Sequence, residues 1–223
     1  MKPVSESKTE TLLYQRWIKR NEALVDSLSG GRLAYVHIEG MNSPSYRWVY
    51  RQLLNDKNRN REAVIIDTRH NGGGWLHDDI AVLFAGRKYS QLEPRGRFVS
   101  DEPHSQWNKP SCMLVCENNY SDAHGTPWVY QQLGLGKIIG TPVPGTMTAV
   151  WWESVPGGYV FGIPQVGVVP QIRKEQNQDG YIENYPLQPD VEVYNTPETL
   201  LQGRDLQIEK AVEVMLRDLD AAR

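Results

Sequence analysis

One strand-like run leads straight into a glycine-rich turn: Ala63-Val64-Ile65-Ile66-Asp67-Thr68-Arg69-His70-Asn71-Gly72-Gly73-Gly74. The apolar, largely β-branched residues at its start favour a strand. The three glycines can adopt backbone angles that are closed to other residues, and their bare N–H groups can approach an anion. The stretch therefore predicts a strand that passes through a glycine-rich elbow into a helix, which is the repeating unit of an α/β protein.

A second stretch has the same form, with Cys112-Met113-Leu114-Val115-Cys116 followed by Asn118-Asn119-Tyr120-Ser121-Asp122-Ala123. It places the hydroxyl of Ser121 at the N-terminus of a helix-like segment. Acyl transfer needs a nucleophile beside oriented N–H groups that receive the oxyanion, so the two elbows together favour a serine hydrolase. A flexible turn at the glycines and a plain helix N-cap at Ser121 are the structural alternatives.

Composition narrows the class of protein. A chain of 223 residues with 39% apolar content can bury a substantial core, and its 14 prolines and 19 glycines suit a loop-rich α/β protein. The formal charge of −3 disfavours nucleic acid as a partner, and no apolar run is long enough for a membrane span. Residues 1–7 lack the apolar core of an export signal. We therefore expect a cytoplasmic chain, or a periplasmic one if it was cut from an exported parent.

Four blocks of sequence carry a resemblance to a known family. In chain order they are Asp67–Gly74, Tyr120–Ala123, Leu133–Pro142, and Ile182–Tyr185 with Pro189–Val193. Together they resemble the catalytic core of the tricorn and C-terminal-processing serine peptidases, the S41 type, over about Gly31 to Leu216. The similarity is greater to the tricorn branch, because residues 144–148 contain no lysine where the tail-specific branch carries its catalytic one.

The resemblance implies a mechanism and a set of site residues. Ser121 is expected to be the nucleophile, with oxyanion donors from the N–H of Asp122 and from Gly73 or Gly74. Glu183 is expected to orient the catalytic histidine through a serine. In tricorn-like enzymes that histidine lies upstream of a PDZ domain that precedes the core, and this sequence contains neither, so the core is expected to be incomplete on its own.

Two further residues are candidates for the predicted site, and only Glu93 is assigned to it. Glu93 lies in a polar stretch where tricorn-like enzymes carry an acid that faces a basic P1 side chain, so it is the candidate substrate-binding residue. His124, three residues after Ser121, is expected to lie too far round the same helix to take the hydroxyl proton. The general base is therefore not identified. Peptides or unfolded polypeptides are the expected substrates, no cofactor is expected, and homo-oligomers are common in both branches.

The family resemblance implies a ClpP/crotonase-like fold, an α/β layered sheet with flanking helices and a C-terminal β-hairpin lip around the site. Residues 1–30 are predicted as an N-terminal helical segment and residues 31–223 as the peptidase core. A long polar stretch without regular structure is predicted for residues 86–107. Helices are predicted at 10–28, 43–54, 76–84, 126–133 and 205–219, and strands at 33–38, 63–69, 112–116, 137–140, 149–154, 158–163 and 166–169.

Other chemistries fit the sequence less well. The glycine run lacks the Gly-Lys-Ser/Thr of a phosphate loop, and the zinc-protease histidine pattern is absent. A metal site could be imagined from the ligand types of His70, His77, Asp78 and Asp79. The spacing of these residues fits no single helix face, so no metal site is predicted. Two alternatives remain open: a crotonase-like acyl-CoA enzyme, which would not need Ser121, and a catalytically inactive peptide-binding module.

Overall fold

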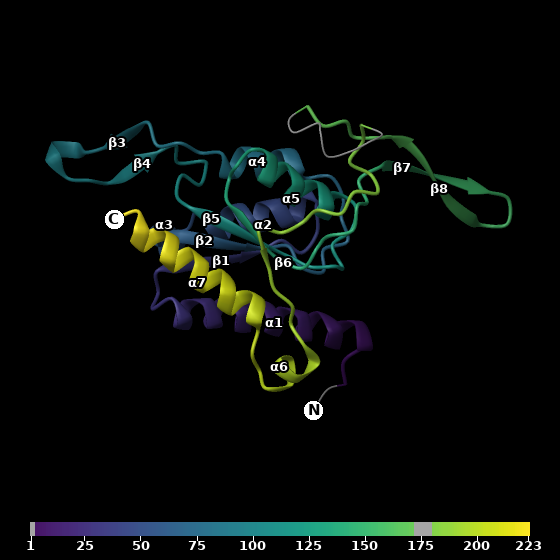
Figure 1. Ribbon diagram of the computed structural model, residues 1–223, viewed down its shortest axis with the longest axis horizontal. Helices are drawn as coiled ribbons and strands as arrows, with labels where there is room; N and C mark the ends of the chain where they lie inside the picture. Colours follow the sequence, from purple (N-terminus) through teal and green to yellow (C-terminus); the bar gives the residue numbers. More distant parts are fainter. Residues whose placement is uncertain (1–2, 172–179) are drawn as a thin grey trace.

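The computed structural model describes residues 3–171 and 180–223, and its framework is a five-stranded sheet (Figure 1). The strands lie in the order β1-β2-β5-β6-β9, and each neighbouring pair is parallel. Their bounds are Leu33–His37 (β1), Ala63–Asp67 (β2), Ser111–Val115 (β5), Lys137–Gly140 (β6) and Val191–Glu192 (β9). The predicted α/β class is therefore confirmed.

Helices cover both faces of this sheet (Figure 1). On one face lie α1 (Glu6–Leu28) and α7 (Leu206–Ala221), and on the other lie α2 (Ser43–Leu53), α4 (His77–Phe84) and α5 (Asp122–Gln132). The short helices are α3 (Asp56–Arg59) and α6 (Pro197–Leu201). None of the described helices is long and apolar enough to cross a membrane.

Side-chain alternation along the central strands explains their continuous apolar runs. Ile66 and Met113 face the core under α2, α4 and α5, whereas Ile65 and Leu114 face the core under α1 and α7. Both faces of a covered parallel sheet are buried, so neither set of positions is polar. Helix α1 packs on β1 and α7, and the predicted boundary at residue 30 stays a prediction.

The register of the sheet brings the two elbows together. Strands β2 and β5 pair with Val64 opposite Ser111 and Asp67 opposite Leu114. Parallel strands end at the same edge of a sheet, so the turns that follow these two strands emerge side by side. In open α/β sheets this carboxyl edge is where ligands bind.

Residues 86–107 correct one prediction, because they contain a hairpin where no regular structure was expected. Strand β3 (Ser90–Leu92) pairs antiparallel with β4 (Ser100–Glu102), and a 3-10 turn, η1 (Pro94–Gly96), lies between them. The pair forms an arm that projects from the body (Figure 1). Polar cross-strand contacts such as Gln91 to Asp101 (3.0 Å) link the two strands. Polar pairs leave no apolar alternation, so hydrophobic periodicity gives no strand signal here.

A second hairpin projects from the other side of the molecule (Figure 1). Strand β7 (Ala149–Val155) pairs antiparallel with β8 (Tyr159–Val166), as predicted for these two segments. The predicted strand at 166–169 is wrong beyond Val166, where β8 ends. The hairpin forms part of the cleft described below.

Candidate active site

The glycine-rich turn and the serine elbow lie in contact at the carboxyl edge of the sheet. The N–H of Tyr120 donates to the carbonyl of Asn71 (3.0 Å). A Cβ on Gly73 would lie only 2.6 Å from Cβ of Ser121 and 2.7 Å from the carbonyl oxygen of Tyr120, and Gly73 has a φ of +94°. Only glycine suits both the space and the backbone angle. Gly73 therefore allows the two elbows to approach this closely.

Ser121 has a strained backbone, with φ 55° and ψ −123°. It occupies the N-cap position of α5, yet its side chain makes no capping hydrogen bond, so a capping role does not account for the serine. Its N–H donates to Oγ1 of Thr146 (3.1 Å), and the residue lines a cleft. Strain of this kind is found where a serine is presented on a sharp strand-to-helix turn, and it persists only when its surroundings hold it.

Two backbone N–H groups beside the serine are available to an anion. Those of Asp122 and Gly74 donate to no other described residue, and both residues line the cleft. The N–H of Gly73 instead donates to the side-chain oxygen of Asn71 (2.8 Å). Of the three predicted oxyanion residues, Asp122 and Gly74 thus have free N–H groups in the described structure, whereas that of Gly73 is occupied.

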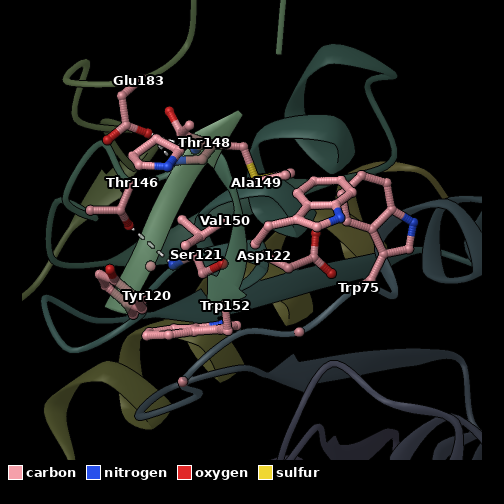
Figure 2. A pocket seen from close by; sticks show the side chains of 16 residues that line it. Trp75, Tyr120, Ser121, Asp122, Thr146, Thr148, Ala149, Val150, Trp152 and Glu183 are labelled. Atoms are coloured by element: carbon pink, nitrogen blue, oxygen red, sulfur yellow. Dashed lines mark hydrogen bonds between the residues drawn. The ribbon is translucent and has the colours of Figure 1, made fainter. Parts of the chain in front are cut away.

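Ser121 opens into a cleft of about 1060 Å³ (Figure 2). Trp75 lines it from the glycine-rich turn, Tyr120 lies beside the serine, and Val150 and Trp152 come from β7. An apolar cleft with a few converging polar groups is typical of sites for small ligands or peptide side chains.

Glu183 lines the same cleft, on the Thr146 side of Ser121 (Figure 2). Its Oε2 accepts the N–H groups of Met147 (2.5 Å) and Thr148 (2.7 Å). Thr146, the residue before them, accepts the N–H of Ser121. Glu183 therefore fixes the segment that holds the serine backbone.

Glu183→Gln is expected to loosen this segment, because a neutral amide oxygen replaces a charged acceptor of two N–H groups. The expected loss in the free energy of unfolding is about 1–2 kcal/mol, the difference between charged and neutral hydrogen bonds. Urea unfolding measures this loss, and hydrogen exchange should become faster at the amides of Met147 and Thr148. Glu153→Gln, at an exposed position on β7, is the matched control and should leave both unchanged. Unaltered exchange at Met147 and Thr148 would contradict the anchoring role.

Comparison with known proteins agrees with this geometry. The sequence pattern of peptidase family S41 matches residues 32–193, which include the whole parallel sheet and the cleft. The chain belongs to peptidase family S41. It is 27% identical over 214 residues to the tricorn protease of Thermoplasma acidophilum, an alignment that covers 92% of this chain and 19% of that protein. It is also 27% identical over 215 residues to tricorn protease homolog 1 of Streptomyces coelicolor, covering 95% of this chain and 19% of that one.

A solved structure of a tricorn protease also matches the fold of this chain. The crystal structure of the tricorn protease matches with a TM-score of 0.82 at 27% identity, covering 93% of this chain and 20% of that one. The predicted resemblance to the tricorn branch is thereby confirmed. The chain spans about a fifth of the length of the curated relatives that it matches.

The histidines of this S41 chain do not reach the serine hydroxyl in the described structure. His124 is buried, and its Nδ1 accepts the N–H of Thr146 (3.2 Å). Burial lowers the pKa of His124 to about 4, although the charge of Glu183 acts the other way. A neutral imidazole whose accepting nitrogen is already bonded is poorly placed to take the proton of Ser121.

His77 is the residue that sequence reasoning missed as part of this site. Its Nδ1 lies 2.5 Å from Oδ1 of Asp122, although the two residues are 45 positions apart in the chain. Their contact exists only because the two elbows meet, so no sequence spacing indicates it. His70, His77, Asp78 and Asp79 do not form a metal site in the described structure. Among the described residues, no group of three or more His, Cys, Asp or Glu side chains is placed to hold a metal ion.

Glu93 lies away from the cleft within one chain. It stands at the N-cap position of η1, on the projecting β3–β4 arm, and it is not among the residues that line the cleft. The role of Glu93 in substrate binding stays a prediction. The position of Glu93 outside the cleft of its own chain does not favour that role.

Proposed function

We propose that this chain is the catalytic core of a tricorn-like serine peptidase. The observation that carries the proposal is the strained Ser121 held against a glycine-rich turn, with the N–H groups of Asp122 and Gly74 free beside it. Oγ of Ser121 would attack the peptide carbonyl carbon, and the two N–H groups would bind the oxyanion that forms. The C–N bond then breaks, the amine leaves with a proton, and water hydrolyses the acyl-enzyme.

In this proposal the general base comes from outside the described residues. A base must lie within about 2.6–3.2 Å of the hydroxyl that it deprotonates, and no described histidine does so. The tricorn resemblance supports a histidine from an upstream segment, and Glu183 would then help to orient it through a serine. We assign the fold to the ClpP/crotonase-like class, supported by the parallel sheet with its glycine-rich turn at the site.

Substrate and assembly belong to the same proposal. The apolar walls around Trp75, Val150 and Trp152 suit the side chains of peptides or unfolded polypeptides. We also propose a homo-oligomer, because β7–β8 exposes large apolar side chains outside the cleft, including Tyr159, Val160 and Phe161, that a second chain could cover.

A fluorophosphonate probe tests the reaction class. With the upstream histidine-bearing segment added, the wild-type chain is expected to be labelled on Ser121, and Ser121→Ala in the same mixture is expected to remain unlabelled. Mass spectrometry of the peptide that contains Ser121 identifies the site. A chain that binds acyl-CoA and takes no label would instead support the crotonase-like alternative, and a chain that does neither would support the inactive peptide-binding module.

A further inference from the structure

The carboxylate of Asp122 joins the serine elbow to the start of α4. Its Oδ2 accepts the N–H groups of Leu76 (2.5 Å) and His77 (3.1 Å), and its Oδ1 bonds to Nδ1 of His77 (2.5 Å). Leu76 is the N-cap residue of α4 and has no polar side chain, so Asp122 provides the cap from another element. The contact also fixes Asp122 relative to Gly74, which lies two residues before Leu76.

The same carboxylate puts a negative charge beside the proposed oxyanion site. The N–H of Asp122 would receive the oxyanion, and the carboxylate belongs to the same residue. The side chain is only 2% exposed, so water screens its charge poorly. An unneutralised carboxylate here would oppose the anion that the N–H groups bind.

The groups around His77 favour its cationic form. The hydrogen bond to Asp122, on α5, is the main cause that raises the pKa of His77 above its ordinary value. Burial acts against it, while the charges of Asp122 and of Asp78 and Asp79, on α4 itself, add to the rise. The ring of Trp75 packs edge-on against the imidazole, with centroids 5.0 Å apart.

We propose that His77 is a positioning residue of the oxyanion hole: as an imidazolium it binds and neutralises the Asp122 carboxylate, so that the N–H groups of Asp122 and Gly74 can hold an anionic tetrahedral adduct on Ser121. The inference rests on the proposed function of Ser121. Neutral His77 keeps the hydrogen bond to Asp122 but loses the charge, so its contribution depends on pH.

The test uses a peptidyl boronic acid and the full 223-residue chain. Oγ of Ser121 donates an electron pair to trigonal boron, an O–B bond forms, and the hydroxyl proton passes to the buffer. The product is an anionic tetrahedral boronate, which boron-11 NMR detects and which needs no general base for its stability. The pKa of His77 is read from its ring resonances, assigned in the wild type by their nuclear Overhauser contacts with the ring of Trp75, with and without the boronic acid.

Formation of the adduct is expected to raise the pKa of His77. A rise of about one unit corresponds to a tenfold preference of the anion for the protonated form, because the coupling is reciprocal. His77→Asn, whose amide can still donate to Asp122, is then expected to bind the boronic acid about tenfold more weakly below that pKa. The difference from wild type should vanish as the pH rises above it.

His104→Asn, at an exposed histidine just after β4, is the matched control and should bind as wild type does. An adduct that leaves the pKa of His77 unmoved, or that forms equally well in His77→Asn at every pH, overturns the role of His77 and leaves Ser121 in place. Failure of the wild type to form any adduct overturns the proposed function, and this inference with it. The titration of wild-type His77 decides the matter even if His77→Asn does not fold.

Discussion

Peptide hydrolysis by these 223 residues alone is expected to increase about 10⁶-fold when the histidine-bearing upstream segment implied by the tricorn resemblance is added. The chain holds a strained serine, two free N–H groups and an anchored carboxylate, but no described histidine bonds to Oγ of Ser121. A site without its base keeps only the catalysis of its oxyanion hole and of binding. Initial rates on fluorogenic peptides, with and without the added segment, measure the gain.

Ser121→Ala in the same mixture is the control, and it should remove the restored activity. Far-ultraviolet circular dichroism should be the same for both chains, because the serine hydroxyl makes no hydrogen bond to a described residue. Vigorous hydrolysis by the wild-type chain alone, lost in Ser121→Ala, would contradict the prediction. It would show that one of the five histidines acts as the base.

The sequence predicts best those parts of the fold where burial requires apolar residues or where the backbone conformation requires glycine. Strand β2 is apolar at every position up to Asp67 because both of its faces are covered, and the turn at residues 72–74 needs glycine because Ser121 packs against it. Periodicity and glycine placement report these constraints directly. They place the proposed nucleophile, Ser121, beside this turn without any knowledge of the contacts around it.

The contacts across the site could not be predicted in the same way. Whether Gly73 or Gly74 has a free N–H depends on the side chain of Asn71, and the partner of Asp122 is a histidine from a different elbow. The two strands of the arm that carries Glu93 are paired through polar side chains. A polar sequence of this kind predicts a loop. Each of these depends on how segments meet in space, and one sequence does not report that.

Arg69→Met is expected to cost about 3–5 kcal/mol in the free energy of unfolding at neutral pH, the usual effect of removing one partner from a buried ion pair. Arg69 is 3% exposed at its side chain and donates to Asp67 (2.7 Å), which is fully buried. It also bonds to Asp205 (2.9 Å) and Gln207 (2.9 Å), so it ties the turn after β2 to the start of α7. Methionine keeps most of the volume and none of these bonds.

Arg32→Met is the matched control, measured by the same urea unfolding. Arg32 pairs with Glu62 and Asp220 where all three side chains are partly exposed, and solvent-exposed pairs contribute little. A much smaller loss is therefore expected there. Equal losses in the two variants would contradict the claim that burial makes the Arg69 pair important.

The dependence on pH separates the charge of Arg69 from its packing. Burial by itself would raise the pKa of Asp67, but the charge and hydrogen bonds of Arg69 outweigh it and hold that pKa below the ordinary 3.8. In the wild type, the stability that Asp67 contributes is thus present above pH 3.8 and is lost as the pH falls through the lowered pKa.

Without Arg69, burial raises the pKa of Asp67, and protonation in mild acid removes the unpaired charge. The stability gap between wild type and Arg69→Met should therefore be widest near neutral pH and should narrow in acid. A gap that does not change with pH would show that lost packing, such as the contact of the guanidinium with Trp17, outweighs the ion pair.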